Sequence, residues 1–275
     1  QLLAEGYIES KPRVGFIVQE LEEPLAPHSS QIDVLSEAPK SKPIRYNFRY
    51  GHIDLAHFPM KTWRKCLLAA MDSERSELLW YSDRQGDIGL RREIQRYLYH
   101  ARGIRCSAEQ IIIGSGTPQL IGILCQLFDF RHDVVALENP CYNVIRIVFQ
   151  NHHFSIIPIE LEEDGLNIDQ LQATNAKLVY VTPSHQLPLG MVLPIGKRQK
   201  LLKWAQQSNG FIIEDDYDSE FRYESKPIPA LKALDTEDRV IYVGTFSKVF
   251  TPAIRTSYMV LPQRLLARFH ERCAN

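Results

Sequence analysis

The chain has 275 residues, of which 44% are hydrophobic and 24% charged, a composition that fits a globular protein with one large core or two smaller ones. Its formal net charge of -1 provides no global basic field that would point to nucleic acid. No apolar run is long enough to span a bilayer and no signal peptide is recognisable, so we expect no membrane partner.

The cysteines are dispersed along the chain and lack CxxC spacing: Cys66, Cys106, Cys125, Cys141 and Cys273. An odd, scattered set argues against a disulfide framework or a zinc site and fits a reducing cytoplasm. The pair His152-His153 has no further ligand at metal spacing and is interpreted as structural, so we expect no metal.

Both ends of the sequence suggest a piece of a longer protein. Residues 1–5 predict the last turn of a helix that ends at Gly6, and no Met precedes them. At the other end, the chain stops just after a helical pattern over 262–272.

The N-terminal segment predicts a hairpin with a basic tip. Short apolar strands at 7–9 and 16–18 flank a turn that carries Lys11 and Arg13. These cations are candidates for contacts with DNA phosphates, which position a protein on DNA without specifying a sequence. For the hairpin taken alone, a solvated tip is the plainer interpretation.

Residues 20–42 combine prolines, acids and serines with few aromatics, which is typical of an extended linker. We therefore predict the remnant of a first domain over 1–19, a linker over 20–43, and a second domain over 44–275 that is truncated at its C-terminus.

In the second domain, strands alternate with helices, which predicts an α/β fold with a mostly parallel sheet covered by helices. The expected helices cover 59–71, 87–101, 118–128, 143–150, 195–207 and 262–272. The expected strands cover 110–113, 134–137, 153–159, 177–182, 240–243 and 257–261, with one more that begins at Phe211.

The segment Gly114-Ser-Gly-Thr-Pro118 joins a strand to a helix. Small residues before a helix, with Pro118 near its first position, expose free backbone amides that suit an anion. The signal is weak alone, because Gly-Ser-Gly is common in loops.

The strand that begins at Phe211 ends in a cluster of carboxylates: Glu214, Asp215, Asp216 and Asp218. A carboxylate at a strand end can keep the ring nitrogen of a pyridine cofactor protonated, which makes the ring an electron sink. The same residue types also fit a site for a hard metal cation or a solvated acidic turn.

The strand over 240–243 leads into Thr245, Ser247 and Lys248, with Arg255 further on. Hydroxyls, a lysine and an arginine at a strand end are the layout of a phosphate-ligand site in an open α/β sheet. A partly desolvated lysine beside other cations can attack a carbonyl to form a Schiff base. The cofactor that combines an aldehyde, a phosphate and a ring nitrogen is pyridoxal phosphate. A solvated lysine in an ordinary turn is the competing interpretation.

Two motifs in combination, Glu214-Asp-Asp-Tyr-Asp-Ser-Glu-Phe221 and Gly244-Thr-Phe-Ser-Lys248, resemble the fold type I, aminotransferase-like domain of the MocR subfamily of GntR-type transcription regulators. The resemblance covers nearly the whole chain. It includes the N-terminal hairpin, which is similar to the wing of a truncated winged helix-turn-helix domain, and the linker that follows.

The resemblance implies a role for individual residues. Lys248 would be the Schiff-base lysine, Asp215 the partner of the ring nitrogen, and Tyr217 the partner of the phenolic oxygen. Tyr142 would stack on the ring, and Tyr81 would reach the phosphate of the cofactor in a partner subunit, although packed loop tyrosines explain both positions as well. The implied phosphate ligands are Ser115, Gly116, Thr117, Thr245, Ser247 and Arg255.

One loop departs from the aminotransferase pattern. In Pro183-Ser-His-Gln-Leu-Pro-Leu-Gly190, Leu187 stands where aminotransferases usually have an asparagine that bonds the phenolic oxygen of the cofactor. Leucine cannot supply that bond, which favours an effector sensor over an efficient transaminase.

Three functions remain open. The favoured one is a homodimeric, DNA-binding transcription regulator that uses pyridoxal phosphate and Lys248 to sense a small amino compound. The second is an aminotransferase that moves an amino group from an amino acid to a 2-oxo acid, with Lys248 as general acid and base. The third is a protein that keeps the fold without the cofactor, and the presence of Lys248, Asp215 and Arg255 together argues against it.

Overall fold

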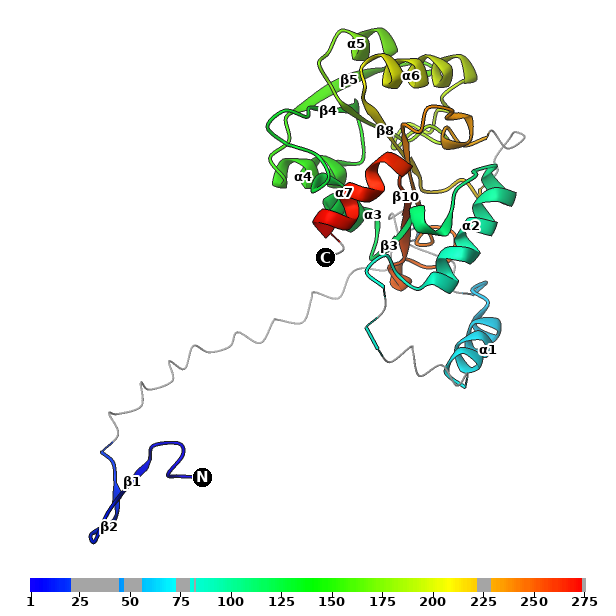
Figure 1. Cartoon of the computed structure of the whole chain (residues 1–275). Coiled ribbons are helices and arrows are strands. Elements are labelled where there is room, and N and C mark those ends of the chain that lie inside the picture. Colours follow the sequence, from blue (N-terminus) through cyan, green and yellow to red (C-terminus); the bar gives the residue numbers. More distant parts are fainter. Residues whose placement is uncertain (21–44, 47–55, 73–79, 82, 222–228, 274–275) are drawn as a thin grey trace. The chain divides into compact units, whose positions relative to one another are not determined.

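The computed structural model describes residues 1–20, 45–46, 56–72, 80–81, 83–221 and 229–273 (Figure 1). The chain divides into two compact units, 1–48 and 49–275. The predicted linker lies outside the described residues except for Glu20, so the predicted domain limits stay a prediction. Within the described ranges, no helix has the length and apolar character needed to cross a membrane.

The first unit holds the predicted hairpin, in which β1 (Ile8–Lys11) pairs antiparallel with β2 (Gly15–Val18). The helix tail predicted over 1–5 is present as a single turn, without an assigned helix. Two backbone amides of this turn donate to the carbonyl of Gln1, and the turn ends at Gly6, which has a φ of 79°.

The second unit is built on an eight-stranded sheet with the order β3-β10-β9-β8-β7-β4-β5-β6. The strands from β9 to β5 in this order are parallel, whereas β10 is antiparallel to both β9 and β3, and β6 is antiparallel to β5. The predicted α/β fold with a mostly parallel sheet is confirmed. The strands are β3 (Ile111–Gly114), β4 (Val135–Asn139), β5 (Ile156–Glu162), β6 (Gly165–Leu166), β7 (Leu178–Val181), β8 (Phe211–Asp216), β9 (Val240–Thr245) and β10 (Ser257–Val260).

Helices cover both faces of this sheet (Figure 1). Apolar side chains of α3, α4 and α7 pack on one face, and those of α5, α6 and α2 pack on the other. The helices are α1 (Met60–Met71), α2 (Ile88–Arg102), α3 (Thr117–Cys125), α4 (Asn143–Asn151), α5 (Ile168–Gln172), α6 (Ile195–Gln207) and α7 (Gln263–Cys273).

The central strands are covered on both faces, so their sequences are continuous apolar runs. All side chains of β7 and β9 are buried. Because successive side chains alternate between faces, Tyr180 of β7 packs with α3, α4 and α7, whereas Tyr242 of β9 packs with α2 on the other face. The same alternation determines on which face of the sheet each polar residue at a strand end lies.

The helices and strands predicted after the linker are present, with displaced ends. The helix expected to reach Phe128 ends at Cys125, and the strand expected from His153 begins at Ile156. The sequence pattern does not predict β6 or α5, because elements of two and five residues are too short to show a period.

Candidate cofactor site

Three chain segments leave the sheet at the same edge. Strands β8 and β9 are parallel, and β10 aligns Ser257 with both Thr245 of β9 and Gly114 of β3. The segments that follow β3, β8 and β9 are therefore neighbours at the carboxyl ends of their strands, where open α/β sheets bind ligands. They carry most of the predicted site residues.

Two of the four clustered carboxylates hold neighbouring loops. Glu214 accepts the backbone amides of residues 231–232 at 2.6 and 2.7 Å. Oδ1 of Asp218 bonds Nδ1 of His185 at 2.8 Å. Burial raises the pKa of Asp218, while His185 and the nearby charge of Lys248 oppose this shift, so Lys248 lies within electrostatic reach of the pair.

Asp216 is a buried anchor. Its Oδ2 accepts hydrogen bonds from Nε of Arg102 and from the Tyr242 hydroxyl, both at 2.7 Å, and its Oδ1 accepts the Ser184 hydroxyl at 2.6 Å. The side chains of Arg102 and Asp216 are 6% and 0% exposed, so this is a buried ion pair whose carboxylate is satisfied by the protein. Asp216 is therefore unsuited to hold a ligand.

The side chain of Asp215 lies on the face of β8 opposite to that of Asp216, and one of its two oxygens can still accept a hydrogen bond from a ligand. The Tyr180 hydroxyl donates to its Oδ2, whereas its Oδ1 is buried and has no hydrogen-bond partner among the described residues. Burial raises the pKa of the Asp215 carboxyl to about 7, and the nearby carboxyls of Asp216 and Asp218 add to the shift. A protonated ring nitrogen would satisfy this oxygen and stabilise the carboxylate, so Asp215 fits the predicted role.

A cradle for an anion lies where the loop after β3 meets Arg255. The Nη2 atom of Arg255 donates to the carbonyl of Ser115 at 3.1 Å. Gly116 has a φ of 106°, and a Cβ at this position would overlap the Arg255 guanidinium. Helix α3 begins at Thr117. Pro118 has no amide hydrogen and the amide of Gln119 donates to the carbonyl of Gly116, so the amide of Thr117 is the donor that the start of this helix offers to an anion beside that cation.

The two hydroxyls before the predicted lysine have different surroundings. The Oγ atom of Ser247 is buried and lacks a partner in the part of the chain that the structure describes. Oγ1 of Thr245 instead accepts the backbone amide of Ser247 at 3.2 Å and the hydroxyl of Ser257 at 2.8 Å. The Ser247 hydroxyl fits a phosphate ligand, and that of Thr245 holds the turn.

Lys248 and Tyr217 are half-buried on the segments that follow β9 and β8. Burial raises the pKa of the Tyr142 phenol, the Asp215 carboxylate adds to this shift, and the Arg255 guanidinium opposes it. Tyr142 is therefore close both to the Asp215 carboxylate and to Arg255 of the anion cradle. A residue that covers the ring of a bound cofactor would have to lie in this position.

Three predicted contact residues lie outside this constellation. Tyr81 is fully exposed, so within one copy of the chain it contributes nothing to the site. Lys11 and Arg13 belong to the first unit, where Lys11 and Glu9 form an exposed ion pair at 3.8 Å.

Three supporting residues are not predicted from the sequence: Tyr180, Arg102 and Gln186. The buried amide of Gln186 donates to the carbonyls of Pro140 and Leu187, both at 2.9 Å, and so ties the loop that carries Tyr142 to the loop after β7. Tyr180 could have been found from the sequence, because it is a tyrosine inside an apolar strand and a buried hydroxyl needs a hydrogen-bond partner. No local pattern links Arg102 to Asp216.

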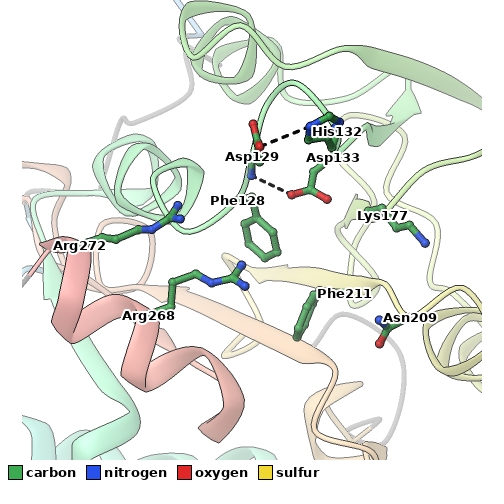
Figure 2. Close-up of a pocket in the computed structure, with 9 residues that line it drawn as sticks. All are labelled: Phe128, Asp129, His132, Asp133, Lys177, Asn209, Phe211, Arg268 and Arg272. Atoms are coloured by element: carbon green, nitrogen blue, oxygen red, sulfur yellow. Dashed lines mark hydrogen bonds and ion pairs between the residues drawn. The ribbon is translucent and has the colours of Figure 1, made fainter.

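A separate cleft of about 370 Å³ lies at the opposite edge of the sheet (Figure 2). Its walls include Lys177 and Phe211, which stand at the amino ends of β7 and β8, and Arg268 and Arg272 of α7. The two arginines donate to the carbonyls of residues 126–127, and the cleft contains none of the predicted cofactor residues.

Comparison with known proteins adds to this geometry. Residues 48–271 match the aminotransferase class I and II family. Over 98% of its length the chain is 43% identical to an uncharacterized HTH-type transcriptional regulator, YdeL, of Bacillus subtilis, and over its whole length it is 31% identical to a probable rhizopine catabolism regulatory protein, MocR, of Rhizobium meliloti. The chain spans 58% of each of these relatives.

A solved structure shares the fold. The kynurenine aminotransferase of Pyrococcus horikoshii, solved in complex with PMP, superposes with a TM-score of 0.74 at 30% identity, over 81% of this chain and 57% of that one.

Proposed function

The chain belongs to the aminotransferase class I and II family, and from this premise we propose that it is the cofactor-binding part of a pyridoxal-phosphate-dependent, DNA-binding transcription regulator of MocR type. The regulator part of the proposal is supported by the HTH-type relatives, which align with nearly the whole chain.

The choice of cofactor is supported above all by the buried oxygen of Asp215 that lacks a partner among the described residues, at the same sheet edge as the Arg255 cradle. Pyridoxal phosphate requires two recognition groups: an acid that binds its ring nitrogen and a cation that binds its phosphate.

When bound, pyridoxal phosphate supplies an aldehyde and a ring that withdraws electrons. Lys248 would hold the cofactor through its aldehyde, and Asp215 would keep the ring nitrogen protonated. Tyr142 would cover the ring, and Tyr217 would bond the phenolic oxygen. The phosphate would be held by Ser115, Gly116, Thr117, Ser247 and Arg255, while Thr245 holds the turn that carries Ser247.

An amine-bearing effector would bind at the place where Lys248 holds the cofactor. Its binding alters the contacts of the cofactor residues and shifts the balance between two arrangements with different affinities for DNA. Lys11 and Arg13 contact DNA phosphates in this proposal. The protein acts as a cytoplasmic homodimer, in which the exposed Tyr81 reaches the partner's cofactor.

The alternative is a working aminotransferase, which is favoured by the fold shared with the kynurenine aminotransferase. The cofactor residues serve both functions. Leu187 weighs against it, because an apolar side chain there cannot bond the phenolic oxygen.

The test uses the full-length protein loaded with pyridoxal phosphate. Visible absorption is recorded as amino acids are added, with and without a 2-oxo acid, and binding to its own promoter DNA is measured under the same conditions. A regulator changes spectrum once and changes its DNA affinity with the same amino acids. Sustained conversion of the 2-oxo acid identifies an aminotransferase instead, and no cofactor band refutes both.

A further inference from the structure

Two buried tyrosines on neighbouring parts of the sheet donate to two adjacent aspartates. Tyr180 of β7 donates to Asp215, and Tyr242 of β9 donates to Asp216 at 2.7 Å. Both tyrosines are at most 1% exposed. The two pairs have the same chemistry but lie on opposite faces of the sheet, because consecutive residues of β8 point in opposite directions.

The two aspartates differ in what else they bind. Asp216 also accepts Arg102 and Ser184, so each of its oxygens has a protein donor. Asp215 has the Tyr180 hydroxyl on Oδ2, while Oδ1 is buried and unpartnered among the residues described. A buried oxygen without a donor is costly, and a structure that keeps one reserves it for a ligand.

We propose that Tyr180 is a positioning residue that occupies one oxygen of Asp215 and thereby aims the other at the ring nitrogen of the bound cofactor. This inference rests on the proposed function, because it requires a ligand with a basic ring nitrogen. Tyr180 touches neither the cofactor nor the effector and acts through Asp215.

The register of the sheet fixes this arrangement. Tyr180 lies opposite Ile213, and Asp215 is two residues further along β8 on the same face, about 6.6 Å toward the carboxyl end. A tyrosine ring spans that distance, and its hydroxyl donates to Oδ2 of Asp215. Oδ1 is left without a donor among the described residues, and the Asp215 carboxylate lies close enough to Tyr142 to raise the pKa of its phenol, which the Arg255 guanidinium lowers.

Tyr180 is also suited to be a permanent donor. Burial raises the pKa of its phenol well above the usual range, and the carboxylates of Asp215 and Glu138 add to the shift, so it stays protonated at physiological pH. A neutral donor on Oδ2 favours the ionised form of Asp215, and the ionised form is the one that holds a protonated ring nitrogen.

The experiment compares two ligands with variants of the full-length protein. The ligands are pyridoxal phosphate and its 1-deaza analogue, in which a carbon replaces the ring nitrogen. Dissociation constants are measured by quenching of tryptophan fluorescence. The variants are Tyr180→Phe and, as a matched control, Tyr242→Phe, which removes a hydroxyl of the same kind from Asp216.

Wild type and Tyr242→Phe are expected to prefer pyridoxal phosphate over the analogue to the same degree. In Tyr180→Phe this preference should fall about tenfold, the factor that corresponds to roughly one charge-assisted hydrogen bond, while the affinity for the analogue is kept. An unchanged preference in Tyr180→Phe overturns the inference, and so does an equal loss in both variants, which would indicate general damage to the core.

The inference can fail separately from the proposed function. If wild type binds neither ligand, the proposed function itself is refuted. If wild type binds both ligands equally well, Asp215 does not hold the ring nitrogen and this inference fails, while the proposed function stands. If Tyr180→Phe does not fold, 3-fluorotyrosine at position 180 keeps the shape and provides a stronger donor. The preference should then equal or exceed that of wild type, and a lower preference contradicts the role of the hydroxyl.

Discussion

Asp215 and Asp216 are adjacent and buried, and each receives a tyrosine hydroxyl, yet their surroundings assign them opposite tasks. The sequence shows four carboxylates at the end of one strand and predicts that one of them serves a cofactor. The choice depends on partners such as Arg102, which is 114 residues from Asp216 in the chain. A local pattern contains no information about such a contact, so only the resemblance to a known family pointed to Asp215.

This difference predicts opposite effects of the same substitution. Asp215→Asn should weaken the binding of pyridoxal phosphate by about 1.5–3 kcal/mol, because a neutral amide replaces a charged acceptor, and should leave the thermal stability of the cofactor-free protein equal or higher. Asp216→Asn should instead destabilise the fold by roughly 3 kcal/mol, because Arg102 then keeps a buried charge without its counter-ion. Ligand titration and thermal unfolding of both variants check this, and the reverse pattern contradicts the assignment.

At the scale of elements, the turn between β3 and α3 depends on one glycine. Gly116 combines a φ of 106° with a position against the Arg255 guanidinium, so a side chain there is both strained and obstructed. The sequence predicts an anion loop at this place from its small residues and Pro118, but it does not predict which cation completes the loop.

Gly116→Ala should lower the affinity for pyridoxal phosphate at least about tenfold, because the new methyl group displaces Arg255 from the phosphate cradle. Gly190→Ala is the matched control, since Gly190 also has a positive φ, of 80°, and no described atom lies within 4 Å of the place that an alanine methyl group would take. Both variants should lose about 1–3 kcal/mol of stability from backbone strain, and only Gly116→Ala should lose affinity. Equal affinities in the two variants would show that the cradle does not hold the phosphate.

The sequence predicts the larger elements well because their patterns are strong. The buried strands β7, β8 and β9 have apolar runs, and α2 and α6 are long enough to show a helical period. The antiparallel direction of β10 could not be predicted, since it depends on pairing with β3, which lies far away in the chain. The side chains that meet at the carboxyl edge follow from this order of strands and not from any single segment.

At the scale of the whole molecule, the cofactor-free protein keeps several acidic groups buried. Burial raises the pKa of Glu138, Glu214 and Asp215 to about 7 each. In an unfolded chain these groups titrate near ~4, so between these values the folded state binds more protons. Stability therefore falls as the pH rises through this window, by up to about 1.4 kcal/mol per pH unit for each group.

We expect the melting temperature of the cofactor-free protein to fall by several degrees between pH 5 and pH 8, and Glu138→Gln should reduce the slope. The carboxyls of Glu109 and Asp164 shift in the opposite direction, but they are exposed, where solvent screening weakens the effect. A melting temperature that rises over this range would show that these buried carboxyls are not protonated in the folded state.

The central claim is that Lys248 carries pyridoxal phosphate. The most direct measurement is to load the full-length protein with the cofactor, reduce it with borohydride, and locate the modified residue by peptide mass spectrometry. Reduction makes the bond between the lysine and the cofactor permanent, so we expect a single label, on Lys248. A label on another lysine, or no label after full reduction, would contradict it.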